Sequence, residues 1–190
     1  MDVVKRLDIE MIGLLKRTML TCATALALPA AASAATQGTA GATSTGSVSI
    51  SATVPGRVQI SGLSDVAFGT VDPSSAASQA QNVCVWSNTS GRVYSVTAAG
   101  SGLSNAFTLS DGTNTLAYGV EWAASSGQSS GTALVSGTAL GSLASTATNP
   151  TCSVGPAASA SLIVRMTAAN LQAAVASSYT GTLTLVVAPQ

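Results

Sequence analysis

The chain has 190 residues, of which only 7% are charged, with a formal net charge of zero and no histidine. This composition provides no basic surface for nucleic acid or for an anionic membrane. An apolar content of 46% argues against disorder, and the length leaves room for one domain after processing.

Short apolar runs, broken by glycine and serine, recur through most of the chain. Many of them alternate with serine or threonine, which is the period of two expected of half-buried strands. This pattern predicts an all-β sandwich.

Residues 1–34 have the features of a secretory signal peptide. Lys16 and Arg17 give a positive start, residues 19–28 form a short apolar stretch, and residues 32–34 are an A-x-A cleavage pattern. The apolar stretch is too short to span a bilayer. The sequence therefore predicts export through the Sec pathway, with translation starting at Met1 or Met11.

The mature chain is expected to begin near Ala35 with a leader, residues 35–46, that lacks large apolar groups and should be flexible. A strand is predicted next, at residues 47–54, with an apolar face made of Val48, Ile50, Ala52 and Val54. From pattern alone, this strand belongs to the domain's own sheet more readily than to a neighbour's.

The middle of the chain alternates predicted strands and turns. Asp72-Pro73 is a turn signal, and residues 88–91 form another turn, although Asn88-Thr89-Ser90 also fits a glycosylation sequon. Residues 123–161 are predicted to form loops and weak edge strands, and residues 168–176 a turn or two of helix. Further strands are expected at residues 57–60, 83–86, 93–98, 107–109 with 115–122 as a hairpin, and 162–166.

The last predicted strand runs from Tyr179 to Pro189, where proline ends the ladder. Its apolar face comprises Tyr179, Leu183, Leu185 and Val187. Either other strands flank it on both sides, or one of its edges is open to another molecule.

Candidate binding and catalytic residues are few. Trp86, Tyr94, Tyr118 and Trp122 could stack on sugars, but their phase with apolar neighbours favours core packing. The acidic residues Asp72 and Asp111 adjoin turns. Beyond Lys5 and Lys16 there is no lysine, and without histidine the usual nucleophile-activating pairs are missing. We therefore expect no enzyme, no catalytic residue, no cofactor and no metal.

In order along the chain, several stretches resemble the spore-coat-U type pilins, the subunits of archaic (Csu-type) chaperone–usher pili. The matching stretches are residues 45–54, 66–71, 83–84, 94–100, 116–118 and 179–185.

The resemblance implies an immunoglobulin-like β-sandwich that lacks its last strand, which the N-terminal strand of a neighbouring subunit supplies. In that case residues 47–190 are the pilin domain, Val48, Ile50, Ala52 and Val54 are the donor residues, and the C-terminal strand borders the groove. The implied partners are a periplasmic pilus chaperone, an outer-membrane usher and neighbouring pilin subunits, with no nucleic acid and no small-molecule substrate. The implied location is the periplasm in transit and then a surface pilus that supports adhesion or biofilm formation.

Two other functions remain open at this point. One is a monomeric secreted adhesin or binding module whose own N-terminal strand completes the sandwich. The other, a hydrolase, has little support in the sequence.

The cysteines depart from the pattern of the resembled family. Such pilins usually pair a cysteine at the position of Cys84 with one early in the first domain strand, roughly where Arg57 stands here. Cys152 is the only other cysteine of the mature chain, and two cysteines in a secreted chain favour a disulfide. We expect a Cys84–Cys152 bond.

Export predicts that mass spectrometry of the secreted protein will find its N-terminus at or near Ala35, because cleavage should follow Ala34. Secreted protein that retains residues 1–34 would contradict this.

Overall fold

The computed structural model describes residues 34–190, so residues 1–33 of the predicted signal peptide lie outside the described part. The chain divides into two units, Met1–Ala52 and Thr53–Gln190. In the first unit, Thr36 and Ser47 form an isolated antiparallel bridge with N–H to C=O bonds of 2.8 and 3.0 Å. Val48 and Ile50 are 71% and 90% exposed.

The strand predicted at residues 47–54 is not part of any ladder in the described chain, apart from the bridge at Ser47. A strand needs a partner for its backbone groups, and none is paired with this segment here. Whether residues 48–54 act as a donor strand stays a prediction.

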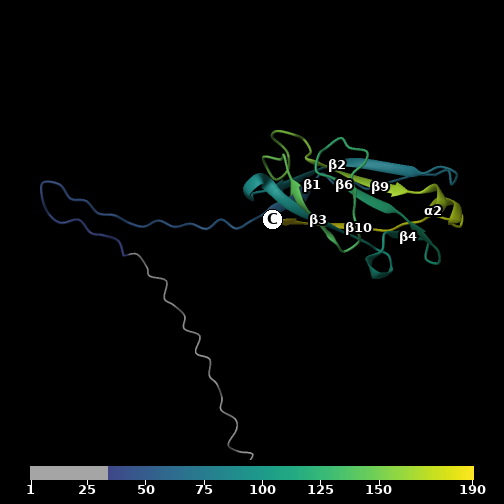
Figure 1. Ribbon diagram of the computed structural model, residues 1–190, viewed down its shortest axis with the longest axis horizontal. Helices are drawn as coiled ribbons and strands as arrows, with labels where there is room; N and C mark the ends of the chain where they lie inside the picture. Colours follow the sequence, from purple (N-terminus) through teal and green to yellow (C-terminus); the bar gives the residue numbers. More distant parts are fainter. Residues whose placement is uncertain (1–33) are drawn as a thin grey trace, which may run out of the picture. The chain divides into compact units, whose positions relative to one another are not determined.

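The regular elements of the second unit are mostly strands, joined by long loops (Figure 1). They are β1 (Val58–Ser61), β2 (Ala77–Ser87), β3 (Val93–Gly100), β4 (Thr108–Ser110), β5 (Thr115–Ala117), β6 (Gly119–Ala123), β7 (Thr132–Ala133), β8 (Ala139–Ala144), β9 (Ala160–Met166) and β10 (Leu183–Pro189). The helices are the 3-10 turns η2 (Ser90–Arg92) and η3 (Leu103–Asn105), and α2 (Ala168–Ala173), which Thr167 caps by accepting the Asn170 N–H.

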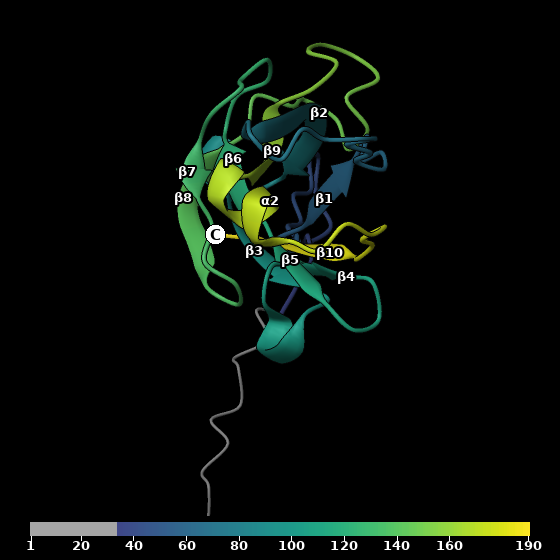
Figure 2. The same cartoon turned by 90° about the vertical axis from the view of Figure 1, so that its right-hand side faces the viewer.

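The strands form two main antiparallel sheets, which confirms the predicted all-β sandwich. One sheet has the order β1-β2-β9-β6-β7 and the other the order β10-β3-β8, while β4 and β5 form a separate hairpin. Seen end-on, the two sheets enclose the core (Figure 2).

The core follows the alternation read from the sequence. Tyr94, Val96 and Ala98 of β3 are fully buried, and Trp122 is 1% exposed. Trp122 Nε1 donates to Tyr94 Oη at 3.1 Å, so the two aromatic residues satisfy each other inside the sandwich. Burial also raises the pKa of Tyr94. These aromatic residues are therefore core, not a sugar-stacking platform.

Two strand predictions need correction. The hairpin predicted for residues 107–109 and 115–122 is formed by β4 and β5 alone, because the chain crosses at Tyr118 and β6 joins the larger sheet. The last strand begins at Leu183 and not at Tyr179, because Thr180 is bridged to Ser110 of β4.

A disulfide joins Cys84 of β2 to Cys152, with a Cα–Cα distance of 5.9 Å. Both cysteines are buried with Ala147, and Trp86 packs against them. The bond ties β2 to the long loop before β9, which is otherwise fixed mainly by side-chain hydrogen bonds such as those of Asn149. In the chain-entropy account, a bridge across 68 residues contributes about 4 kcal/mol.

The Tyr94–Trp122 contact yields a stability prediction. Tyr94→Phe leaves the buried indole N–H without an acceptor, so we expect the free energy of unfolding to fall by about 1–3 kcal/mol. Tyr179→Phe is the matched control, because its hydroxyl donates to Val175 O at 2.7 Å from a partly exposed position where water can replace the bond. Urea unfolding measures the loss of stability in both variants. Equal losses would show that the buried Trp122–Tyr94 hydrogen bond stabilises the domain no more than the exposed one.

Candidate strand-binding groove

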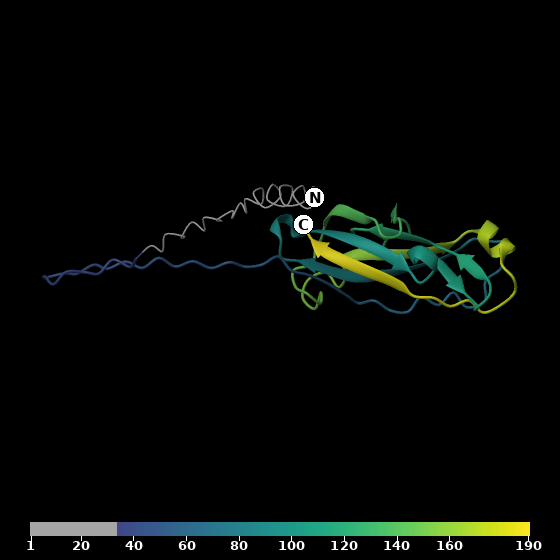
Figure 3. The same cartoon turned by 90° about the horizontal axis from the view of Figure 1, so that it is seen from below.

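The edge of β10 that does not face β3 is unpaired among residues 34–190. Figure 3 shows β10 as the yellow arrow beside the teal β3. Gln190 N–H donates to Val93 O, so the backbone groups of the even-numbered residues bond toward β3 and those of the odd-numbered residues point outward. The backbone N–H and C=O groups of Leu183, Leu185 and Val187 therefore lie on the open edge.

β1 presents a second open edge beside the first. It pairs with β2 on one side only, in the register Val58 to Ser87. Because Asn88 N–H donates to Arg57 O at 3.1 Å, the residues of β1 that bond to β2 are the odd-numbered ones. The backbone groups of Val58 and Ile60 thus face away from β2, toward the side where β10 lies (Figure 2).

An apolar groove opens beyond the end of β1, next to the start of β10. A cavity of about 350 Å³ lies between the segment that follows β1 and the start of β10. It is lined by Leu63, Ser64, Asp65, Val66, Phe68, Gln81, Leu109, Tyr118, Leu162, Val164, Met166, Gly181, Thr182, Leu183 and Leu185.

A second cavity, of about 670 Å³, continues the first. The two share Val66, Phe68, Leu109 and Met166, and the second extends to residues 174–180. We call the two cavities together the strand groove. Leu63 and Val66, on its wall, are 48% and 37% exposed, so the groove leaves apolar surface in water.

The wall that follows β1 is held by an amide side chain. Gln81 of β2 reaches Ser64, which lies three residues beyond Ser61, the last ladder residue of β1. Its Oε1 accepts the Ser64 N–H at 2.8 Å, and its Nε2 donates to Ser64 O at 3.0 Å. The side chain thus replaces a missing backbone partner and keeps residues 62–66 alongside β2.

Asp72 and Asp111 serve turns, as their sequence context predicts. Asp72 Oδ1 accepts the Ser74 N–H at 2.8 Å, and this bond lowers the pKa of Asp72. The Asn114 side chain and the N–H groups of Asn114 and Thr113 hold the pKa of Asp111 well below its ordinary value. Each carboxylate therefore stabilises its own loop.

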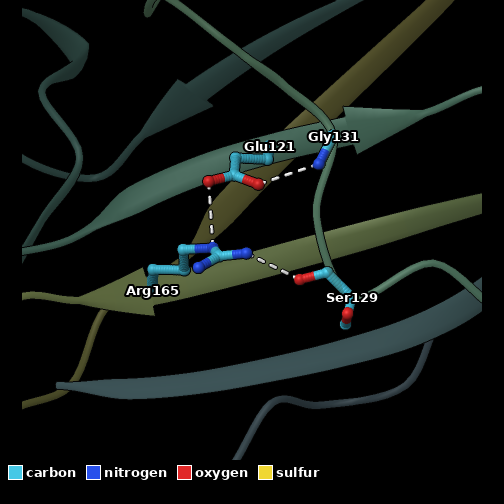
Figure 4. Close-up of polar contacts among 4 residues, drawn as sticks. All are labelled: Glu121, Ser129, Gly131 and Arg165. Atoms are coloured by element: carbon cyan, nitrogen blue, oxygen red, sulfur yellow. Dashed lines mark hydrogen bonds and ion pairs between the residues drawn. The ribbon is translucent and has the colours of Figure 1, made fainter.

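Glu121 forms the one ion pair of the described residues with Arg165 (Figure 4). Arg165 Nε lies 2.9 Å from Glu121 Oε1, and Arg165 Nη2 donates to Ser129 O at 2.6 Å. Glu121 Oε2 accepts the Gly131 N–H at 2.9 Å. The pair is partly exposed and contributes roughly 0–1 kcal/mol, so its role is to hold the β6–β7 loop.

Residues 34–190 contain no group of three or more histidine, cysteine, aspartate or glutamate residues placed to bind a metal. In the same part of the chain, no helix has the length and apolarity to cross a membrane.

The predicted site residues fall into two sets. Leu183 and Leu185 line the first cavity, Tyr179 lines the second, and Val187 packs half-buried against the core. Of the predicted donor residues, Val48, Ile50 and Ala52 lie in the first unit, and Val54 is 80% exposed in the second. Sequence reasoning missed the groove wall at residues 62–68 and the amide contacts of Gln81 and Asn88. No sequence pattern indicates which residues lie opposite a segment that is not a regular strand.

Comparisons with known proteins identify no family. No family model matches the chain, and no curated protein matches it. Among solved structures, a similar chain occurs in the CsuC–CsuE chaperone–tip adhesion subunit pre-assembly complex from archaic chaperone-usher Csu pili of Acinetobacter baumannii. The similarity has a TM-score of 0.41 and 21% identity, over 71% of this chain and 40% of that chain. Function therefore has to be inferred from the groove itself.

An open groove predicts that the apolar residues of its wall contribute less to stability than the residues of the central strands. Leu162→Ala, at a position 3% exposed, should cost about 2–5 kcal/mol, whereas Leu185→Ala on the half-buried face of β10 should cost about 1 kcal/mol. Urea unfolding of the dilute monomer measures both. Equal costs would mean that something within the chain already covers Leu185.

Proposed function

We propose that this protein is the structural subunit of a secreted surface pilus and that it polymerises by donor-strand complementation. In this proposal, residues 48–54 of one copy fill the strand groove of the next. A periplasmic chaperone covers the groove before assembly, and an outer-membrane usher receives the subunit. The fibre would support adhesion or biofilm formation.

The observation that carries the proposal is the pair of open strand edges beside an apolar groove. Unpaired edges attract any extended chain, and exposed apolar surface adds to that tendency. A strand added along the open edge of β10 would pair its backbone with the outward groups of that edge and place alternate side chains in the groove. The groove thus calls for an extended segment with apolar residues at every second position.

Residues 48–54 have the pattern and the length that the groove requires. The free edge of β10 is 7 residues long, which at about 3.3 Å per residue is roughly 20 Å between the first and last Cα. Residues 48–54 span the same length and place four apolar side chains on one face. Val48, Ile50 and Val54 are exposed in the structure, so they are free to enter another copy.

Ile50→Asp tests the proposal. In the polymer, the aspartate would be buried without a partner, at a cost of several kcal/mol, so SDS-resistant polymers should disappear. The subunit alone should keep its stability within about 0.5 kcal/mol, because residue 50 is 90% exposed there. Gel electrophoresis without boiling measures assembly, and recovery of a soluble subunit complex with its chaperone measures folding.

Ser51→Asp is the matched control, since residue 51 lies on the opposite face of the segment and its charge would remain in water. The variant should still polymerise. If the protein is instead a monomeric binding module completed by its own strand, Ile50→Asp should unfold the domain and abolish the soluble complex as well. That outcome would overturn the proposed function.

A further inference from the structure

Asn88 holds the point at which the N-terminal segment joins the domain. Its backbone N–H donates to Arg57 O at 3.1 Å, its Oδ1 accepts the Arg57 N–H at 2.6 Å, and its Nδ2 donates to Pro55 O at 2.9 Å. Asn88 stands opposite Arg57 in the register that pairs Val58 with Ser87. Beyond the last ladder pair, one side chain therefore takes the place of the missing backbone partners.

These contacts fix the direction of residues 55–57. In an extended strand, residues two apart present their carbonyl groups to the same neighbour. Because Pro55 O and Arg57 O both bond to Asn88, the line of β1 continues backwards through Gly56 to Pro55. Gly56 itself adjoins the last residue of β10, since a methyl group in place of its α-hydrogen would lie 3.6 Å from the side chain of Pro189.

This direction matters because the subunit carries both a groove and a segment able to fill one. The end of β10 lies next to Gly56, so the tethered segment leaves the domain beside the strand whose open edge borders its own groove. To enter that groove, the chain would have to reverse at Pro55-Gly56, a dipeptide well suited to a turn. A segment on so short a tether has an effective concentration of about millimolar, which would outcompete a second copy in dilute solution.

Resting on the proposed function, we propose that Asn88 is a positioning residue that keeps the donor segment out of its own subunit's groove. A reversal at Gly56 breaks the Asn88–Pro55 bond and turns Arg57 away from Asn88. The clamp thereby directs residues 48–54 to a second copy of the chain. In this role the Asn88 amide bonds to the backbone, which agrees with the turn expected at residues 88–91.

The test measures how tightly the mature chain binds a fluorescent peptide that has the sequence of residues 47–54. Fluorescence anisotropy of the peptide reports the binding. The chain is kept monomeric by dilution and checked by light scattering. The wild type should bind the peptide, and Asn88→Ala should bind it at least about tenfold more weakly, because its own segment occupies the groove. The double variant Asn88→Ala/Ile50→Asp should recover binding, since its own segment can no longer enter.

Asn149→Ala is the matched control. Asn149 is a half-buried amide that likewise accepts a backbone N–H, from Ser153 at 2.9 Å, and donates to a backbone carbonyl, of Val154 at 2.6 Å. It should bind the peptide as the wild type does. Trypsin checks the fold: Asn88→Ala should be cut about tenfold faster after Arg57, because two hydrogen bonds there are lost, but not after Arg165 in the central strand β9.

The outcomes separate this inference from the proposed function. Equal peptide binding by the wild type and Asn88→Ala overturns the role of Asn88 and leaves the groove function intact. Binding by Ile50→Asp but not by the wild type means that the wild type fills its own groove, which also overturns the inference. No binding by any variant overturns the proposed function and this inference with it.

Discussion

The unpaired edge of β10 is the constraint on which the rest of the structure depends. Backbone groups in a sandwich must be paired or hydrated. An unpaired edge beside exposed leucine and valine side chains tends to pair with another chain. The side chains of Leu183 and Leu185 pack against the core, whereas their backbone N–H and C=O groups lie on the open edge. The domain is a folded sandwich whose core lacks cover at one place, and the groove marks that place.

β2 organises the wall on the other side of the groove. It pairs with β9 at the centre of the larger sheet and with β1 at its edge, and Cys84 anchors it to the following loop. Beyond both ends of the β1 ladder, amide side chains continue the pairing, with Asn88 opposite Arg57 and Gln81 opposite Ser64. Side chains of β2 and of the turn after it therefore hold the wall where no regular strand forms. In a chain with so little charge, such amide contacts fix loops alongside the single ion pair of the described residues.

The sequence predicted the sandwich and most of its strands because alternation is a local property. Leu116, Tyr118, Val120 and Trp122 share a buried face, as their spacing requires, yet the spacing did not reveal that the chain changes sheets at Tyr118. Tyr179 has the right phase for the last strand, but the next residue, Thr180, is bridged to Ser110 of β4 instead of pairing with β3. The open edge was one of two alternatives from the sequence. Only the order of strands in the sheet decides between them, and that order depends on contacts far apart in the chain.

Amide hydrogen exchange at Leu183, Leu185 and Val187 tests the central claim most directly, because only an inserted strand can protect these N–H groups. In the dilute monomer they should exchange rapidly, while those of Val96 and Val164 in paired strands exchange slowly. Addition of a peptide with the sequence of residues 47–54 should slow all three to the range of the paired strands. Protection of all three in the monomer alone, or no change with saturating peptide, would contradict the claim that this groove receives a strand from another copy.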